Sequence, residues 1–471
     1  METNCIKKVW CGSEGPIARS LAKLAIPIIC INLLQVAYQL TDAFWVGRLG
    51  ANAVASVSIS FPITFLLVSV ATGFSIAGSA LVAQHSGARN HSRVNHVAAQ
   101  TLILVVSFSV ILSAVGWIFS PWLLRLMNVD SGVADNALRF LRAIFLGLPF
   151  MFSFTVFQSV LRGVGQVKVP MVIIFCTTTL NFILDPLFIF GWKCIPALGV
   201  AGAAMATFGT QVVAAVIGLC LLFFGNYPIH LSSSHFKADF PFLKKLFFLG
   251  LPASLEQSIR SLGILVMMFL ITSFGIITTA VYGVGSNLLQ LVIIPAVGIS
   301  VASSVLVGHN IGAGKMKRAH DTAVLSAIIS FVVLSAIGLL CFLFAENLVR
   351  FFVPNDKEVI KQGATFVRIM SLSFGFLGAQ MSLSGVFRAS GNLIIPLLFS
   401  VVSFWVLQFP AAYILSKHTS LGILGLWWAF PISYILTTLL AVVWFVKGDW
   451  KNKRLIGEEE LTEVLVETPG Q

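Results

Sequence analysis

The stretch Gly73-Phe-Ser-Ile-Ala-Gly-Ser-Ala-Leu-Val82 recurs 225 residues later as Gly298-Ile-Ser-Val-Ala-Ser-Ser-Val-Leu-Val307. Upstream, at the same offset, Leu24-Ala-Ile-Pro27 matches Leu249-Gly-Leu-Pro252. Self-similarity at a fixed offset is the sequence signature of a duplicated structural unit. The chain is therefore predicted to consist of two homologous halves.

A further match carries the repeat toward the end of each half. Arg162-Gly-Val-Gly-Gln-Val-Lys-Val-Pro170 aligns with Arg388-Ala-Ser-Gly-Asn-Leu-Ile-Ile-Pro396 at an offset of 226. Each half holds an even number of predicted spans, so both halves enter the membrane from the same side. Parallel repeats of this kind are related by an axis along the membrane normal, with the substrate site between them. Duplication that only builds a stable bundle is the simpler alternative.

Composition places both halves in a membrane. The 471 residues are 57% hydrophobic and 10% charged, against about 25% charged for a soluble domain. A span needs about 20 mainly apolar residues. That criterion predicts an all-α polytopic protein with twelve spans, near 20–47, 52–83, 97–119, 137–160, 169–191, 198–225, 243–273, 277–308, 322–344, 361–386, 394–416 and 420–446.

These spans define five segments and one orientation. The net charge of +12 is spread in short groups between apolar runs, which argues against a nucleic-acid partner. Nineteen Lys and Arg residues fall on the side of both termini and ten on the other. The positive-inside rule then places both termini in the cytoplasm. The predicted segments are a cytoplasmic start (1–19), an N-lobe (20–225), a linker (226–242), a C-lobe (243–446) and a cytoplasmic tail (447–471).

Only three acidic residues, Asp42, Asp185 and Glu256, lie within the predicted spans. A charged side chain at the bilayer centre costs about 2.5–3.5 kcal/mol on insertion scales, so each requires an explanation. Asp42 and Asp185 lie about 9 and 10 Å below the outer ends of the first and fifth spans, at 1.5 Å per residue. Two acids at similar depth favour a shared function. The alternative is that each acid only forms a hydrogen bond to a neighbouring helix.

Polar side chains accompany both acids. Tyr38 and Gln35 precede Asp42 by one and two helical turns on the same face. Asn181 and Thr178 precede Asp185 in the same way, and the sixth span adds Thr207. This set is rich in oxygen and contains neither His nor Cys, so it suits a proton or Na⁺ better than zinc or copper. No further cofactor is expected.

A proline next to Asp185 frees one backbone carbonyl of the fifth span. Pro186 directly follows Asp185, and because proline has no N–H it leaves the carbonyl of Phe182 without its helical donor. We therefore predict that the fifth span can bend here.

The second half does not repeat the acid pair. Asp42 corresponds to Met267, and Asp185 corresponds to Ala411. The cation site is therefore predicted in the N-lobe alone, and Met267 is expected to give the substrate pocket an apolar wall. Glu256 lies four residues before Arg260, a spacing that favours an intrahelical structural or gating pair over a substrate counter-ion.

One stretch imitates a phosphate-binding loop. Gly308-His-Asn-Ile-Gly-Ala-Gly314-Lys315-Met316 is one residue too long, and Met316 replaces the Ser or Thr that would bind Mg²⁺. The sequence thus gives no sign of an ATPase or another enzyme. Transport is expected to be driven by an ion gradient.

With these features established, the chain resembles the multidrug and toxic compound extrusion (MATE) family up to about Lys447, most closely its prokaryotic DinF-like branch. The resemblance is carried by Gln39-Leu-Thr-Asp42, Gly47-Arg-Leu-Gly50, Gln84-His-Ser-Gly87-Ala88-Arg89, Leu161-Arg162-Gly-Val-Gly165, Asn181-Phe-Ile-Leu-Asp185-Pro186 and Phe387-Arg388-Ala-Ser-Gly391.

The resemblance implies two six-helix lobes around a central cavity in the bacterial cytoplasmic membrane, acting as a monomer. It implies export of small cationic or amphipathic drugs in exchange for H⁺ or Na⁺. Pro27 resembles the family's hinge in the first helix. By the same resemblance, Asp42, Asn181, Asp185 and Thr207 form the cation site, and Gln35, Tyr38, Gln158 and Thr178 line the drug pocket.

The chain departs from the family pattern in the seventh span. Members that bind the ion in the C-lobe carry a carboxylate where this chain has Arg260, so C-lobe ion binding is not expected.

Two other functions stay open. A lipid-linked oligosaccharide flippase of the same superfamily would need cationic residues in its cavity, and the first six spans have none at mid-membrane. A channel or a receptor would need a different distribution of polar groups, because here they concentrate in the outer half of one lobe.

Overall fold

A computed structural model describes residues 15–126, 131–192, 196–225 and 227–455 of the chain. Residues 1–14 of the predicted cytoplasmic start and 456–471 of the predicted tail lie outside the described residues.

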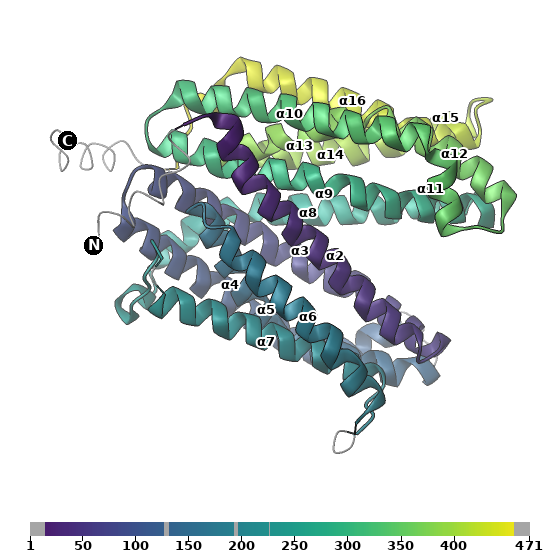
Figure 1. Ribbon diagram of the computed structural model, residues 1–471, viewed down its shortest axis with the longest axis horizontal. Helices are drawn as coiled ribbons and strands as arrows, with labels where there is room; N and C mark the ends of the chain where they lie inside the picture. Colours follow the sequence, from purple (N-terminus) through teal and green to yellow (C-terminus); the bar gives the residue numbers. More distant parts are fainter. Residues whose placement is uncertain (1–14, 127–130, 193–195, 226, 456–471) are drawn as a thin grey trace. The chain divides into compact units, whose positions relative to one another are not determined.

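Within these ranges the chain is almost entirely helical (Figure 1). The first half contains α2 (Ile17–Gly47), α3 (Ala51–Gly87), α4 (His91–Leu126), α5 (Ser131–Gly163), α6 (Lys168–Phe190) and α7 (Val200–Phe224). The second half contains η1 (Ser233–Phe236), α8 (Phe240–Thr272), α9 (Ile276–Gly312), α10 (Met316–Leu343), α11 (Ala345–Phe352), α12 (Lys357–Ser371), α13 (Phe374–Ala389), α14 (Ile394–Val401), η2 (Val402–Gln408), α15 (Phe409–Lys417), α16 (Ile423–Lys447) and η3 (Asp449–Lys451).

The predicted spans are confirmed, with one difference. Among the described residues, eleven helices are long and apolar enough to cross a membrane, and α12 with α13 supplies a twelfth as a pair bent by 48°. The hydroxyls of Ser371 and Ser373 bond to the carbonyls of Arg368 and Met370, each at 2.8 Å. Because serine can satisfy backbone groups freed by a break, a bent span is tolerated where a continuous one was expected.

The eleventh span carries a second irregularity. Its central part, η2, is a π-helix, a feature that commonly inserts one residue into an α-helix. Ser403 within it exchanges hydrogen bonds with Ser433 of α16, at 2.9 and 2.8 Å. The inserted residue shifts the repeat register, so the position equivalent to Asp185 becomes Ala412 instead of the expected Ala411.

The described helices form two compact units. The first, the N-unit, comprises Cys30–Ser86 and Asn90–Ser254. The second, the C-unit, comprises the described chain up to Ile29, the short segment Gly87–Arg89, and the described chain from Leu255 onward. The units thus differ from the expected lobes (20–225 and 243–446), because the first part of α2 belongs to the C-unit and the first part of α8 to the N-unit.

Equivalent close contacts hold these exchanged helix segments. In the N-unit, a Cβ atom on Gly73 of α3 would overlap the backbone of Ser254, whose hydroxyl donates to the Val70 carbonyl at 3.0 Å. In the C-unit, a Cβ atom on Gly298 of α9 would overlap the side chain of Ile29. Gly73 and Gly298 are related by the repeat offset, as are Ile29 and Ser254. Small residues allow such close helix approach in membranes.

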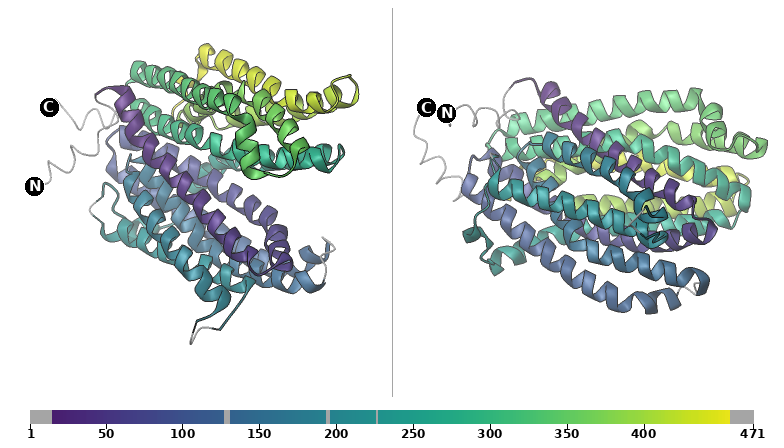
Figure 2. Two further views of the ribbon diagram at one scale, coloured as in Figure 1. Left: turned by 45° about the vertical axis from the view of Figure 1, so that its right-hand side comes forward. Right: turned by 60° about the horizontal axis from the view of Figure 1, so that its bottom comes forward.

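Within each unit the helices pack as a bundle. In the N-unit α5 packs against α4 and α7, and α6 packs against α7. In the C-unit α9, α10 and α13 pack against one another, as both Figure 1 and Figure 2 show for these green helices. The C-unit core gathers around Met267, Phe366, Trp427 and Phe430, each at most 3% exposed.

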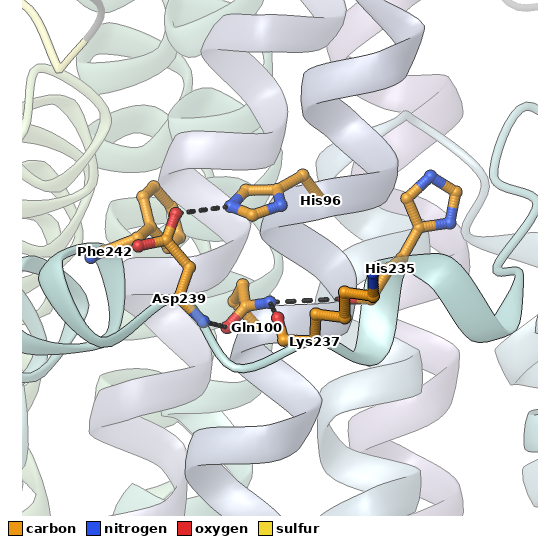
Figure 3. Close-up of polar contacts among 6 residues, drawn as sticks. All are labelled: His96, Gln100, His235, Lys237, Asp239 and Phe242. Carbon is orange, nitrogen blue, oxygen red and sulfur yellow. Dashed lines mark hydrogen bonds and ion pairs between the residues drawn. The ribbon is translucent and has the colours of Figure 1, made fainter.

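The chain that follows α7 folds back onto α4. Gln100 of α4 donates from Nε2 to the carbonyls of Lys237 (2.7 Å) and His235 (3.2 Å), and its Oε1 accepts from the Asp239 amide (3.1 Å). Figure 3 shows the Gln100 amide between these backbone groups. One buried side chain therefore anchors the linker predicted at 226–242.

Asp239 joins this linker to α8. Its Oδ1 accepts from the Phe242 amide at 3.1 Å, in the manner of a helix N-cap. Its Oδ2 lies 3.3 Å from His96 Nε2 (Figure 3), an ion-pair distance without hydrogen-bond geometry. The start of α8 is consequently fixed to the N-unit.

Candidate functional site

Both mid-span carboxylates lie in the N-unit, within electrostatic reach of each other. Asp42 on α2 and Asp185 on α6 are close enough for their side chains to interact with each other. Asn181, one turn before Asp185, donates from Nδ2 to Asp185 Oδ1 at 3.0 Å. Asn181 and Asp185 are fully buried, and Asp42 is half-buried. The two acids that the sequence placed at one depth therefore form one cluster.

Hydroxyl groups complete this cluster. Tyr38 of α2 shares a hydrogen bond of 2.9 Å with Thr210 of α7. Thr207, also on α7, lies near Asp42 and Tyr38, but its hydroxyl lacks hydrogen-bond geometry to either. Three helices of the N-unit thus contribute polar groups to the Asp42–Asp185 cluster.

Helix packing explains why α6 and α7 meet here. A Cβ atom on Gly202 of α7 would overlap the carbonyl of Phe188 on α6, so the two backbones approach closely just beyond Asp185. This glycine lies a little more than one turn before Thr207 along α7. Further along α7, Thr207 and Thr210 lie near Asp42 and Tyr38 of α2.

Several oxygen atoms of the cluster have no donor among the described residues. A buried acceptor without a donor costs about 1–3 kcal/mol, more when it is charged. A proton shared by the carboxylates, or a cation held by the oxygens, removes that cost. The atoms are Asp42 Oδ1, Asp185 Oδ2, Asn181 Oδ1 and Thr207 Oγ1, and Thr178 Oγ1, three residues before Asn181 on α6, also has no partner.

The donor chemistry suits a hard monovalent ion as well as a proton. All of these atoms are oxygens, the ligand type that alkali and alkaline-earth cations prefer. Only two of them are carboxylate oxygens, from Asp42 and Asp185, and the others are neutral. Across the described residues, no three His, Cys, Asp or Glu side chains are grouped to hold a metal ion.

Not every predicted pocket residue joins the cluster. Tyr38 does, through Thr210. Gln35 is exposed on α2, and Gln158 is buried on α5, and neither makes a hydrogen bond to the cluster among the described residues. Met267 requires a correction: it is 1% exposed within the C-unit core, and a side chain packed there on all sides cannot form the wall of an open pocket.

Sequence reasoning missed Thr210, although a signal existed. Thr210 lies three residues after Thr207 on α7, so the two share a helix face. Its partner Tyr38 could not be identified, because the rotation of α2 relative to α7 is set by packing and not by spacing.

The structure also corrects the pairing of Glu256. Glu256 forms its ion pair with Arg388 of α13, not with Arg260 one turn along α8. Arg260 stays within electrostatic reach of Glu256, Arg388 and Tyr434. An exposed helix would favour the intrahelical pair, but here α13 brings Arg388 against a Glu256 carboxylate whose side chain is only 4% exposed.

The two predicted hinge prolines lie inside continuous helices. Pro27 is in α2, two residues before the point where that helix passes from the C-unit to the N-unit. Pro252 occupies the equivalent place in α8. Pro186 lies within α6, directly after the buried Asp185.

Comparison with known proteins agrees with this architecture. The family model MatE matches the chain twice, over residues 27–187 and 252–414. These matches begin at the equivalent prolines, Pro27 and Pro252, which confirms the internal repeat. The chain belongs to the MatE family, the multidrug and toxic compound extrusion transporters, and not to a class of enzymes.

Curated relatives match along nearly their whole length. The "Probable multidrug resistance protein YoeA" of Bacillus subtilis is 29% identical over 447 residues, covering 94% of this chain and 96% of the relative. The "Probable multidrug resistance protein NorM" of Thermotoga maritima is 28% identical over 448 residues, covering 95% and 96%.

Solved structures share the fold. A "multidrug resistance MATE family transporter" in an outward-facing conformation has a TM-score of 0.88 at 24% identity, covering 94% of this chain and 99% of that chain. A transporter from Pyrococcus furiosus, whose title reports a "reverse polarity of binding pocket", has a TM-score of 0.87 at 24% identity, covering 94% and 98%. At this identity the likeness shows the fold alone.

Proposed function

We propose that this chain exports small cationic or amphipathic molecules across the bacterial cytoplasmic membrane in exchange for H⁺ or Na⁺. Asp42 and Asp185 are the coupling carboxylates in this proposal, and Asn181 and Thr207 complete the cation site. The observation that carries it is the meeting of two mid-span carboxylates with oxygen atoms that lack a donor. The names of the curated relatives support drug export.

The exchange follows from competition between two states of the protein. A cation arriving from outside neutralises the Asp42–Asp185 cluster and favours the inward-open state. A substrate captured on the cytoplasmic side then favours the outward-open state. Each ligand shifts the equilibrium only by its difference in affinity for the two states.

The other parts of the proposal are structural. Pro27 and Pro186 act as hinges, because a proline removes a helical hydrogen bond and weakens the helix locally. Gln35, Tyr38, Gln158 and Thr178 line the drug pocket. Both termini lie in the cytoplasm, as the Lys and Arg distribution favours, and the protein acts as a DinF-like monomer.

The test is efflux of a fluorescent organic cation from vesicles that contain the purified protein. A pH gradient and a sodium gradient are imposed separately, which identifies the coupling ion. In Asp42→Asn and Asp185→Asn we expect gradient-driven efflux to fall to the passive leak, because the cluster then loses one of its two negative charges.

The matched control is Asp135→Asn. Asp135 is exposed on α5 and pairs with Arg139, so its loss removes a carboxylate from the same unit without touching the cluster. Transport at the wild-type rate in both cluster variants would contradict the proposal.

A further inference from the structure

The C-unit has a polar face on α8 that the proposed cation exchange does not use. Glu256, Arg260, Gly263 and Met267 follow one another by three or four residues, so they share one side of the helix. Glu256 contacts Arg388 of α13, and a Cβ atom on Gly263 would overlap Phe404 of η2. This side of α8 is therefore directed into the C-unit and not toward lipid.

The charges on this face do not cancel. The single carboxylate of Glu256 is engaged by Arg388, and both side chains are mostly buried. Arg260 lies beside them, yet its guanidinium has neither an ion pair nor a hydrogen bond among the described residues. This face therefore holds two guanidinium groups and one carboxylate, which leaves one positive charge in excess inside a membrane-spanning region.

Arg260 differs from its neighbours on this face in exposure. Its side chain is part-exposed, whereas Glu256 is 3% and Met267 1% exposed. Tyr434 of α16 lies next to Arg260, and Thr437, one turn further, has a buried hydroxyl oxygen with no partner among the described residues. α16 thus places a tyrosine beside Arg260 and an unpartnered threonine hydroxyl one turn along the same helix.

The internal repeat relates Arg260 to a position in the first half of the chain. Arg260 is equivalent to Gln35 of α2, and Met267 is equivalent to Asp42. Where α2 has Asp42, α8 therefore has an uncharged residue, and two turns earlier α8 has an arginine where α2 has a glutamine. A guanidinium presents parallel N–H donors that match a carboxylate in bidentate geometry.

From this arrangement we propose that Arg260, next to the fixed Glu256–Arg388 pair, binds a carboxylate group of the transported molecule. The proposal rests on the proposed function and deepens it, because it names a carboxylate as a group that the transported molecule carries in addition to its cationic group. The preferred substrates are then zwitterionic amphiphiles, not simple lipophilic cations.

The test compares two dyes that differ at one group. Tetramethylrhodamine carries a cationic ring system and a free carboxylate, and its methyl ester keeps the cation but masks the carboxylate. Binding of each dye to the purified full-length protein in lipid nanodiscs is measured by fluorescence anisotropy without any gradient. We expect the wild type to bind the free acid about tenfold more tightly than the ester, as a hydrogen bond between charged groups allows.

Three variants sharpen the comparison. Arg260→Gln installs the residue found at the equivalent Gln35 position, and it should bring the affinity ratio to about one while leaving ester binding unchanged. Arg260→Lys keeps the charge without the planar donor pair and should give an intermediate ratio. Arg368→Gln removes an exposed arginine from the same unit and should keep the wild-type ratio.

An equal ratio in the wild type and in Arg260→Gln, or a wild-type preference for the ester, overturns the inference. A measurement on the wild type alone guards against a variant that fails to fold: benzoate should displace the free acid, whereas benzamide should not. Displacement by neither compound also overturns it. Failure of the proposed function is seen separately, as absence of gradient-driven efflux of the ester from vesicles.

Discussion

The N-unit and the C-unit share a backbone plan but differ in charge at equivalent places. Where the N-unit has Asp42, the C-unit has Met267, and where it has Ile31, the C-unit has Glu256. Arg162 and Arg388 also occupy equivalent positions, but Arg388 is paired with Glu256, whereas Arg162 has no ion-pair partner among the described residues. The N-unit thus brings two acids together, whereas the C-unit places one acid beside two arginines.

This difference shows which features the repeat constrains. Gly73 and Gly298 are retained in both halves because two helices approach closely at each, and a larger residue would separate them. Side chains that do not lie at such a close approach can differ between the halves without separating the helices. Duplication can therefore keep a packing scheme and still place different charged groups in its two copies.

The largest loss of stability is expected when the Glu256 carboxylate of the C-unit is removed. Glu256→Gln leaves Arg388 and Arg260 near each other without a neutralising charge, and removing one partner of a buried ion pair costs about 3–5 kcal/mol. Thermal unfolding of the detergent-solubilised protein should show a lower midpoint. In the N-unit the equivalent Ile31 has no such role, so the loss of stability would be specific to the C-unit.

The control for that variant is Glu346→Gln. Glu346 pairs with Arg350 on the exposed α11 at 2.8 Å, and an exposed pair of this kind contributes about 0.3–0.5 kcal/mol. The double variant Glu256→Gln with Arg388→Gln should recover part of the stability. Equal unfolding midpoints for Glu256→Gln and Glu346→Gln would show that the buried ion pair contributes no more to stability than the exposed one.

A smaller loss of stability is expected when the close helix contacts at Gly73 and Gly298 are disturbed. Gly73→Ala forces a methyl group against the backbone of Ser254, whereas Gly298→Ala meets the flexible side chain of Ile29. Overpacking costs about 1–3 kcal/mol, and we expect Gly73→Ala to be the more destabilising of the two in thermal unfolding.

Gly209→Ala on α7 serves as the reference for this pair. Nothing lies within 4 Å of a Cβ atom at Gly209, so the higher helix propensity of alanine should slightly stabilise the protein. Similar losses at Gly73, Gly298 and Gly209 would contradict the importance of the two close approaches.

The smallest effect concerns how each unit secures the chain that follows its last helix. In the N-unit Gln100 makes three hydrogen bonds to the linker backbone, whereas in the C-unit the fully buried Trp450 stacks near His320 of α10. Gln100→Ala leaves buried backbone groups unpaired at a cost of about 1–3 kcal/mol, reduced wherever water can reach them.

Hydrogen exchange measures that change locally. In Gln100→Ala the Asp239 amide should exchange faster, and amides around Trp450 should keep their wild-type protection. Gln362→Ala, which removes one side-chain bond on α12, should leave both regions unaltered. Unchanged protection at Asp239 would mean that Gln100 does not hold the linker.

Much of the fold could be predicted from the sequence, because hydropathy and internal repetition can be read directly from the order of residues. The spans follow from the length of apolar runs, and the depth of Asp42 and Asp185 follows from the fixed rise of a helix. Their similar depth was enough to predict one shared cluster. The break between Ser371 and Phe374 and the π-helix at 402–408 were not predicted, because both lie within uninterrupted apolar runs.

By itself, the sequence determined that the chain is a duplicated bundle of membrane-spanning helices with the acids Asp42 and Asp185 at similar depth in the first half. The apolar composition favours placing the chain in lipid, and there a helix satisfies the hydrogen bonds of its own backbone. Only the tertiary structure decided that Tyr38 meets Thr210, that Arg388 and not Arg260 pairs with Glu256, and that the first parts of α2 and α8 are exchanged. Those outcomes depend on how each helix is rotated and packed against its neighbours, which residue spacing along one helix cannot specify.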